Sequence, residues 1–599
     1  MKATPADRPL PSADPWDDLL PPVVVGLGVA LAAQSLPTDA PALRGLLSTE
    51  GGPDGEIALP VFRLAGRAKV APDVLAARLA GAFPATPGVR AVSAKGGYVN
   101  VAFEPTHLVT ATLDRVFARG ERYGHAEPDG RSACVEHTSA NPTGPFHIGR
   151  VRNAIIGDTL ARVRRAAGEA VTTQYYVDDM GRQAAMISWI WSKPLADWPA
   201  PIRAAVEGEE RPDDKPDRRW GRPYPAVSAY VKEHAEARDE VANVVQRVES
   251  LEPPPRHHEL AQQILDGMLQ SLARLGIGFD EFVWESSFVA DGSVDRVLER
   301  LRHAPHAVEQ ANGAWAIDTS SYRLPKESAL VVFQRGDGTS LYVTRDVAYH
   351  LAKFARFPET VDVLGQDHQL HARTLEALLA ELGEAHRPTF VIYQDITVPE
   401  GGRMSTRGGS AVWLDHLLDE AFERARKEVL ARREDLADAD VDRIAEAVAA
   451  GAVRYHIVRV APEKPVVFRW EDALSFEGRS GPFVQYAYAR ASSVLRRSDS
   501  AGGPFPFEAG RLGLAEEVDL VRTLSRLPGV VAYAARTAHP HSVAGYAHDL
   551  ADAFNRFYQS VPVLRSGDER ASRLALVAAA RQALGNTLDL LGVPRLESM

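Results

Sequence analysis

Residues 136–158 read EHTSANPTGPFHIGRVRNAIIGD, and the prediction of the fold starts from this stretch. Residues 133–135 before it are typical of the end of a short buried strand. Its segment 141–145, Asn-Pro-Thr-Gly-Pro, is rich enough in turn residues to form a loop. Apolar residues then recur at helical spacing over 149–167, and a second strand follows at 171–177. The stretch therefore predicts a strand–loop–helix–strand unit of a parallel sheet.

His147, Gly149 and Arg150 lie where the predicted helix begins. A helix N-terminus carries unpaired N–H groups and a positive dipole end, so it favours a phosphate. Gly149 lets a nucleotide come close, His147 offers an imidazole N–H, and Arg150 offers a permanent cation. The alternative is a histidine that only caps the helix. The order differs from the phosphate-loop pattern G-x-x-x-x-G-K-[ST], which the chain does not contain.

A second motif, Arg-Met-Ser-Thr-Arg at 403–407, is flanked by glycine pairs that could serve as hinges. Together, the two motifs resemble the HIGH and KMSK signatures of class I aminoacyl-tRNA synthetases. The sequences SANPTGPFHIG, RNAIIGD, LYVTRD at 341–346 and SFEGRSGPFVQYAYAR at 475–490 resemble arginyl-tRNA synthetases in particular. The resemblance covers about residue 95 to Met599. It implies an enzyme that activates L-arginine with ATP to arginyl-adenylate and pyrophosphate, then transfers arginine to the 3′ end of tRNA(Arg).

Composition is that of an ordinary globular protein of several domains, with 599 residues, 45% hydrophobic and 25% charged. The net charge of −11 argues against a general nucleic-acid coat, but a local basic face can still bind RNA. The one cysteine, Cys134, excludes an internal disulfide and a cysteine-rich zinc site, and its apolar strand suggests a core position.

The longest apolar run, Val23–Ala33, is too short to span a bilayer, and acidic residues precede it where a signal peptide needs positive charge. We therefore expect a cytoplasmic protein that does not contact a membrane. A monomer is expected.

We expect three domains. An α/β, Rossmann-like, doubly wound parallel-sheet catalytic domain at 126–430, with a connective insertion at about 190–285, follows a small α+β domain at 1–125. An all-α helical bundle at 431–599 completes the chain. By the resemblance, the first domain contacts the outer corner of the tRNA and the bundle binds the anticodon.

The expected secondary structure follows apolar periodicity and turn residues. Helices are predicted at 23–33, 72–83, 228–250, 258–275, 411–431, 440–459, 482–497, 513–538, 543–560 and 570–592. One further helix is predicted to start near Arg345, and another to end at Gly383. Strands are predicted at 57–62, 98–103, 361–364 and 390–393, with a hairpin of 329–333 and 341–344 around Asp337-Gly338.

The resemblance also assigns the substrate sites. A guanidinium has five N–H donors and is always charged, so a pocket for arginine must offer carboxylates. The resemblance gives this role to Asp346, helped by Tyr342, and gives the α-amino end to Glu136 and Asn141. His368 stands where the family often has glutamine, so Gln366 or Gln369 could substitute. The implied arginine-binding residues are Glu136, Asn141, Tyr342, Asp346, His368 and Gln369.

For the nucleotide, the resemblance implies that His147 donates toward the α-phosphate and that Arg403 and Arg407 lie over the leaving pyrophosphate. Mg2+ is implied with ATP, and no protein ligand for it is readable; Asp367, His368 and His371 are a minority alternative for a metal site. The implied catalytic residues are His147, Gly149, Arg150, Arg403, Ser405 and Arg407, and the ATP-binding residues are His147, Gly149, Arg150 and Met404.

Besides His368, three positions depart from the family pattern. Arg150 replaces the second histidine, Thr406 replaces the second lysine, and Gly144 stands where many relatives have lysine. Arg150 and Thr406 motivate an alternative, a catalytically silent tRNA-binding paralogue. Another alternative is a different nucleotidylyl transferase, although such enzymes are usually shorter and lack the helical domain.

Two further groups have open interpretations. Asp178 and Asp179 follow a strand, so they lie either near the amino-acid pocket or in a solvated loop. Aromatic and polar residues on two C-terminal helices suit the stacking of unpaired bases, but without the resemblance they would indicate core packing. The tRNA-binding residues implied are Gln485, Tyr488, Arg490, Asn555 and Tyr558.

Overall fold

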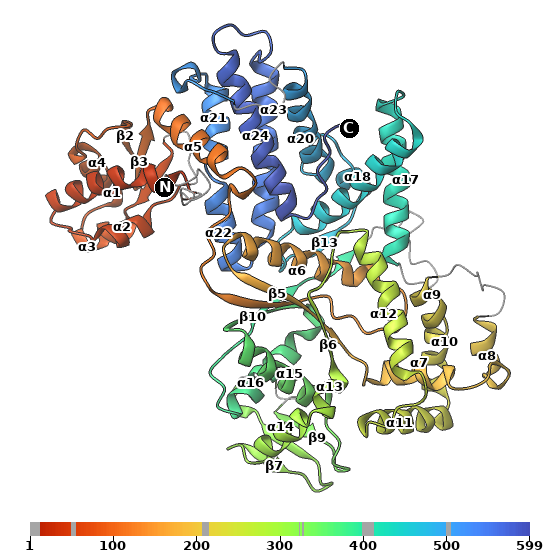
Figure 1. Ribbon diagram of the computed structural model, residues 1–599. Coiled ribbons are helices and arrows are strands. Elements are labelled where there is room, and N and C mark those ends of the chain that lie inside the picture. Colours follow the sequence, from red (N-terminus) through yellow and green to blue (C-terminus); the bar gives the residue numbers. More distant parts are fainter. Residues whose placement is uncertain are drawn as a thin grey trace, which may run out of the picture.

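The computed structural model describes residue 12 and residues 14–49, 55–206, 215–322, 324–325, 329–397, 413–498 and 505–599 (Figure 1). Arg403, Met404, Ser405 and Arg407 lie outside the described residues.

A five-stranded parallel sheet forms the centre of the molecule, in the order β11-β10-β4-β5-β6. Its strands are β4 (Ser132–Glu136), β5 (Ala170–Val177), β6 (Glu281–Trp284), β10 (Glu359–Gly365) and β11 (Thr389–Tyr393). The chain continues from β4 to β5 on one side, whereas β10 pairs on the other side. In such a sheet the ligand crevice lies where the order reverses, at the carboxyl ends of β4 and β10. The predicted fold class is confirmed.

Helices cover the sheet and join its strands (Figure 1). They are α6 (Ile148–Ala166), α7 (Arg182–Trp191), α12 (His257–Ala273), α13 (Glu285–Ala290), α14 (Ser293–Arg302), α15 (Tyr342–Arg356) and α16 (Gln369–Glu381). Between α7 and α12 the chain forms α8 (Ala200–Ala204), α9 (Pro216–Gly221), α10 (Tyr224–Glu233) and α11 (Ala235–Glu249). The predicted helix 228–250 is thus two helices, because His234 is extended. The insertion predicted to end near 285 overlaps β6, which pairs with β5 in the main sheet.

The predicted second strand of the hairpin, 341–344, is wrong. A small antiparallel sheet of β7 (Ala307–Glu309), β8 (Trp315–Asp318) and β9 (Leu330–Gln334) precedes it, and β9 pairs with β8. The turn closes with a single bridge between Gln334 and Ser340, and α15 begins at Tyr342. Tyr342 and Asp346 therefore lie one turn apart on one helix.

The N-terminal domain is a three-stranded antiparallel sheet with helices against it. Its elements are α1 (Trp16–Ala33), α2 (Ala40–Leu46), β1 (Ile57–Pro60), α3 (Phe62–Ala68), α4 (Pro72–Ala82), β2 (Val89–Lys95) and β3 (Tyr98–Phe103), and α5 (Pro105–Arg119) follows. Trp16 Nε1 donates to the Ser525 carbonyl (3.1 Å), and Tyr123 Oη donates to the Leu524 carbonyl (2.8 Å). This domain is therefore joined to the C-terminal helices, beside which it lies in Figure 1.

Helix α1 is longer than the apolar run 23–33. With 18 residues and a mean hydropathy of 1.4, it could cross a membrane by length and composition alone. Half of the helix is buried inside the structure, with Leu19, Val23 and Leu27 wholly inaccessible. Such burial is typical of a core helix in a folded domain.

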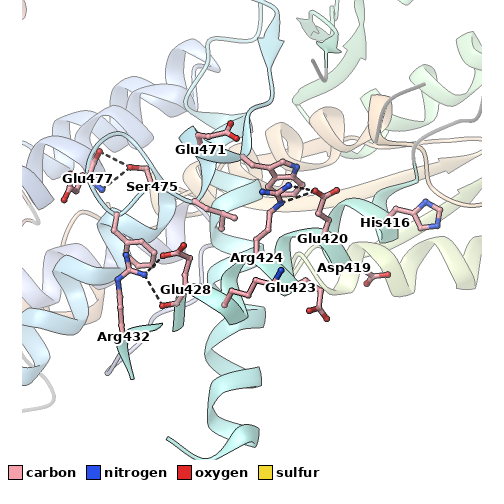
Figure 2. Close-up of a pocket in the computed structure, with 14 residues that line it drawn as sticks. His416, Asp419, Glu420, Glu423, Arg424, Glu428, Arg432, Glu471, Ser475 and Glu477 are labelled. Carbon is pink, nitrogen blue, oxygen red and sulfur yellow. Dashed lines mark hydrogen bonds and ion pairs between the residues drawn. The ribbon is translucent and has the colours of Figure 1, made fainter. Parts of the chain in front are cut away.

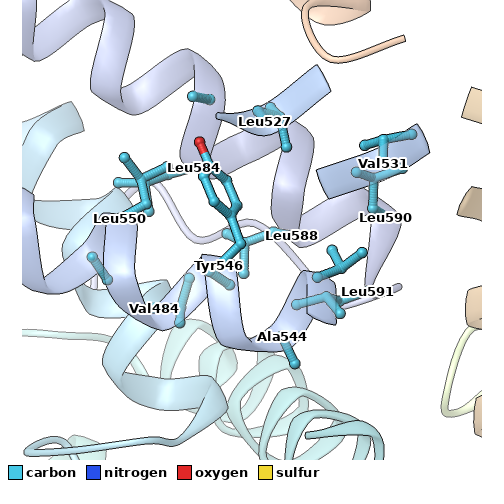
Figure 3. Packing of buried hydrophobic residues seen from close by; sticks show 14 of the residues in the cluster. Val484, Leu527, Val531, Ala544, Tyr546, Leu550, Leu584, Leu588, Leu590 and Leu591 are labelled. Atoms are coloured by element: carbon cyan, nitrogen blue, oxygen red, sulfur yellow. The ribbon is translucent and has the colours of Figure 1, made fainter. Parts of the chain in front are cut away.

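The C-terminal part is helical, as predicted. It contains α17 (Leu414–Arg432), α18 (Asp438–Val458), α19 (Trp470–Ala473), α20 (Gly481–Arg496), α21 (Ala515–Leu524), α22 (Leu527–Thr537), α23 (His541–Ser560) and α24 (Arg570–Leu590), with a short pair of strands, β12 (Ile396–Thr397) and β13 (Val466–Val467). The predicted helix 513–538 is two helices, since Pro528 starts a new one. Leu550, Leu584 and Leu588 pack around Tyr546 in the core of the bundle (Figure 3).

Candidate active site

The loop after β4 is fixed by Asn153 of α6. Its Oδ1 accepts the Thr138 N–H (2.6 Å), and its Nδ2 donates to the Val363 carbonyl of β10 (2.7 Å). Thr138 and Ser139 have positive φ angles of 72° and 37°, which non-glycine residues rarely adopt. Asn153 therefore holds a strained loop at the point where the strand order reverses. The motif RNAIIGD contained this residue, but sequence reasoning gave it no role.

His147 caps α6. Its Nδ1 accepts the Gly149 N–H (3.0 Å), and its ring meets Trp413 edge to face at 6.0 Å between centroids. Burial, helped by the charge of Arg150, lowers the pKa of His147. The neutral ring therefore carries its proton on Nε2, so this nitrogen can donate to a ligand. Capping and phosphate binding are thus compatible, because they use different nitrogens.

Asp346 on α15 accepts two histidine contacts. His371 Nε2 lies 2.6 Å from its Oδ2, and His350 Nδ1 lies 3.0 Å from its Oδ1. Burial alone would raise the pKa of Asp346, but the two histidines together hold it below its ordinary value. The carboxylate is therefore ionised at neutral pH. The exposed ring of Tyr342 lies over His371, at 5.1 Å between centroids.

Behind Asp346 runs a buried chain of alternating charges that sequence reasoning missed. His350 Nε2 contacts Asp362 Oδ2 (2.7 Å), and Lys353 Nζ donates to Asp362 Oδ1 (2.7 Å) and Glu136 Oε2 (2.9 Å). Burial and Lys353 would lower the pKa of His350, but Asp346 and Asp362 outweigh them and raise it to about 9. The spacing of 346, 350 and 353 on one helix face was the available signal.

Hydrogen bonds fix Asn141 and the aspartate pair that follows β5. Asn141 Nδ2 donates to Asp178 Oδ2 (3.0 Å) and Gln183 Oε1 (3.2 Å), and Asp178 Oδ1 accepts the Gly181 N–H (2.7 Å). Asp179 is wholly buried and accepts both the N–H (3.0 Å) and the hydroxyl (2.6 Å) of Ser286. The solvated-loop interpretation is therefore wrong for Asp179.

His368 and Gln369 begin α16 at the end of β10. The rings of His368 and His371 lie 6.4 Å apart, and the Gln369 side chain is exposed. Gln366, the other substitute considered, is engaged with Asp395 (2.7 Å). Among the described residues, no group of three His, Cys, Asp or Glu side chains is arranged to hold a metal ion.

A second pocket, of about 720 Å³, lies between α20, α23 and the C-terminus. The Arg490 guanidinium stacks between two rings, with its Cζ 4.6 Å from the ring centroid of Tyr486 and 4.9 Å from that of Tyr558. It also donates to Asn555 Oδ1 (2.6 Å). The other cationic residues that line this pocket are Arg433, Arg496, Arg497 and Arg565. Tyr558 is exposed and Tyr486 is half-buried, and cations beside such aromatic rings suit an RNA base and its phosphates.

Two residues predicted to touch tRNA are instead in the core, so a direct role for them is wrong. Gln485 is wholly buried and donates to the Ala447 (3.0 Å) and Pro594 (2.9 Å) carbonyls. Tyr488 is 2% exposed and donates to Glu597 (2.9 Å). Core packing was the alternative interpretation, and it holds for these two side chains because α18 and α24 cover their face of α20.

A groove of about 1300 Å³ between α17 and residues 470–477 has a different character. Figure 2 shows Glu420 bound to Arg424 and Glu428 bound to Arg432, among further carboxylates. Carboxylates outnumber cations in its lining. This surface therefore disfavours an RNA backbone.

The parallel sheet, the capped helix at its switch point and the helical C-terminus define a class I aminoacyl-tRNA synthetase. Three family models match: Arginyl tRNA synthetase N terminal domain over 49–103, the catalytic domain of class I (R) tRNA synthetases over 112–470, and the DALR anticodon binding domain over 484–599. The chain belongs to the arginine–tRNA ligase family.

Named relatives and solved structures agree. The arginine–tRNA ligase of Methanocella arvoryzae is 42% identical over 90% of this chain and 92% of its own length. The arginine–tRNA ligase of Halorubrum lacusprofundi is 40% identical over 96% of this chain and 99% of its own length. The structure of Thermus thermophilus arginyl-tRNA synthetase matches with a TM-score of 0.79 and 27% identity, over 96% of this chain and 99% of that one.

Proposed function

We propose that this arginine–tRNA ligase activates L-arginine with ATP in the crevice between β4 and β10, then passes the arginyl group to the 3′ end of tRNA(Arg). The observation that carries the site is the ionised Asp346 held between His350 and His371 at that crevice. A permanently charged guanidinium requires such a fixed acceptor.

On the nucleotide side, the arginine carboxylate attacks the α-phosphorus and pyrophosphate leaves, so the protein must position the reactants and neutralise charge. His147 Nε2–H donates to the α-phosphate, beside the space left by Gly149, and Arg150 adds charge at the same helix start. By family resemblance, Arg403 and Arg407 hold the pyrophosphate, with Met404 and Ser405 beside the nucleotide. Mg2+ would arrive with ATP, bound by the phosphates and water.

On the amino-acid side, Asp346 pairs with the guanidinium and the Tyr342 ring covers it. The Asn141 NH2 group donates hydrogen bonds to Asp178 and Gln183. Its Oδ1 is therefore the atom that can accept a hydrogen bond from the α-ammonium group of arginine. Glu136 is 8% exposed and bound to Lys353, so its charge acts on the α-ammonium end from behind the pocket.

For tRNA, the stack of Tyr486, Arg490 and Tyr558 offers faces for unpaired anticodon bases, and the neighbouring arginines offer phosphate contacts. We also propose three domains, at residues 1–125, 126–430 and 431–599. We further propose a cytoplasmic monomer.

The test is ATP–pyrophosphate exchange with each amino acid, with and without tRNA(Arg). Among the amino acids, we expect only arginine to support exchange. Asp346→Asn should raise the KM for arginine about 100-fold and leave the KM for ATP within about twofold, because a charged hydrogen bond to arginine is lost. Equal rises in both constants would assign Asp346 a structural role. Binding of tRNA without exchange for any amino acid would identify a silent paralogue.

A further inference from the structure

One tyrosine at the edge of the crevice has a buried hydroxyl without a partner. Tyr176 is the second-last residue of β5, and part of its side chain is accessible. Its hydroxyl oxygen is buried and makes no hydrogen bond to any residue that the structure describes. The adjacent Tyr175 differs, because its hydroxyl donates to the Ala140 carbonyl (2.6 Å). A buried polar atom without a partner is unfavourable, so it usually marks a place where a ligand or water binds.

The surroundings place Tyr176 in the wall of the proposed arginine pocket. Its ring stacks on Tyr349 of α15, with 4.5 Å between centroids and 15° between planes, and Tyr349 lies almost one turn after Asp346. Its N–H donates to the Ser139 hydroxyl (3.1 Å), which in turn donates to Glu136 (3.0 Å). Tyr176 is thus held between the loop after β4 and the helix that carries Asp346.

The charges around the hydroxyl favour a cationic ligand. Burial, followed by the charges of Glu285 and Asp346, raises the pKa of Tyr176 well above its usual value. The hydroxyl therefore stays protonated and neutral. The nearby cation, Arg345, is engaged with Glu285 (2.6 Å) and Ser340 (3.2 Å). An incoming guanidinium would meet carboxylates and one neutral oxygen acceptor.

We propose that the Tyr176 hydroxyl accepts a hydrogen bond from the guanidinium of bound arginine, and so acts with Asp346 as a specificity-determining residue. This inference rests on the proposed arginine site. A guanidinium presents several N–H donors in one plane, so two fixed acceptors from different elements can engage it together.

The test is Tyr176→Phe, which removes one oxygen and keeps the stacked ring. Arginine-dependent exchange should show a KM for arginine raised at least about tenfold, with the KM for ATP within about twofold. Without ligand, the Tm should be unchanged or higher, because the variant removes an unpaired polar atom. The rise in Tm on adding arginine should shrink.

Two matched variants make the result specific. Tyr175→Phe removes a hydrogen-bonded hydroxyl from the preceding residue and should lower the Tm. Tyr546→Phe removes a second unpaired buried hydroxyl, in the C-terminal bundle far from α15 in the sequence (Figure 3). It should leave the Tm unchanged or higher and the KM for arginine unaltered.

An unchanged KM for arginine in Tyr176→Phe would overturn the proposal. So would a lower Tm or a failure to fold, because the hydroxyl would then have a structural role such as holding a buried water. If the wild-type enzyme shows no arginine-dependent exchange, the proposed function itself fails. If Asp346→Asn affects arginine and Tyr176→Phe does not, only this inference fails.

Discussion

At the residue scale, the two nitrogens of His147 have separate tasks. Nδ1 accepts from Gly149 and fixes the ring, and Nε2 then points its proton away from the helix. The lowered pKa keeps the ring neutral at pH 7, so Nδ1 remains an acceptor. The helix cap and the proposed catalytic donor are therefore one residue.

His147→Asn should separate these tasks, because asparagine caps a helix well but does not reach as far. We expect kcat for arginine-dependent exchange to fall by about 100-fold or more, the effect of removing one preorganised donor. The free energy of unfolding should stay within about 1 kcal/mol, and His147→Ala should be the less stable variant. Near-wild-type exchange by His147→Asn would remove this ring from the mechanism.

At the scale of single elements, α6 can lie against the sheet only because residue 157 is glycine. A Cβ built there would come within 2.2 Å of His137 Cβ. The side chain of His137 is buried, with its ring 4.7 Å from that of Phe279, so it cannot move aside freely. The close approach sets the position of the N-terminus of α6.

Gly157→Ala should therefore destabilise the protein by about 1–3 kcal/mol, as overpacking does, and lower the exchange rate. Gly545→Ala in α23 is the control, since a Cβ there meets nothing within 4 Å. It should stabilise by up to about 1 kcal/mol, because alanine favours a helix. Urea unfolding measures both, and equal effects of the two variants would contradict this account.

Helix α15 gives stability that depends on pH. Burial and Lys353 would lower the pKa of His350 in the folded state, but Asp346 and Asp362 outweigh them and raise it from an ordinary value of 6.5 to about 9. A raised pKa contributes stability that is complete below pH 6.5 and is lost as the pH rises through 9.

Between pH 6.5 and 9.5, the free energy of unfolding of the wild-type protein should accordingly fall by about 3 kcal/mol relative to that of His350→Asn, whose side chain at 350 cannot titrate. Unfolding by urea at several pH values measures the difference. Parallel curves for the two proteins would show that His350 is neutral in the folded state.

At the scale of the whole molecule, one buried arginine joins the domains. Arg454 of α18 binds Asp158 of α6 and donates to the Leu275 (2.7 Å) and Leu591 (2.8 Å) carbonyls. The C-terminal bundle is therefore attached to α6, the helix that His147 caps. Although the chain carries a net charge of −11, arginines gather in the pocket beside Tyr558.

Tyr558→Ala should weaken tRNA(Arg) binding about tenfold, the loss of one stacked base, with an unchanged dependence on salt. Arg565→Ala should reduce that salt dependence, because it removes a phosphate contact. Tyr533→Ala, an exposed tyrosine on α22, is the control and should have no effect. Equal discrimination of altered anticodons by Tyr558→Ala and wild type would refute the anticodon assignment.

Local pattern alone determined much of this protein. Turn residues and periodicity placed the loop at 141–145, the start of α6 at His147 and most C-terminal helices, because these depend on neighbours along the chain. Cys134 is also buried as predicted, and burial raises the pKa of its thiol to about 12.

Other features were decided only by tertiary packing. Residues 341–344 have a strand-like composition, but the pairing along the free edge of β9 stops at the Gln334–Ser340 bridge, and α15 starts at Tyr342. Gln485 and Tyr488 look like a binding face, yet α18 and α24 cover them. The links from Glu136 to Lys353 and from Tyr176 to Tyr349 join residues that are distant in sequence. Such contacts depend on which elements pack together, and no local pattern carries that information.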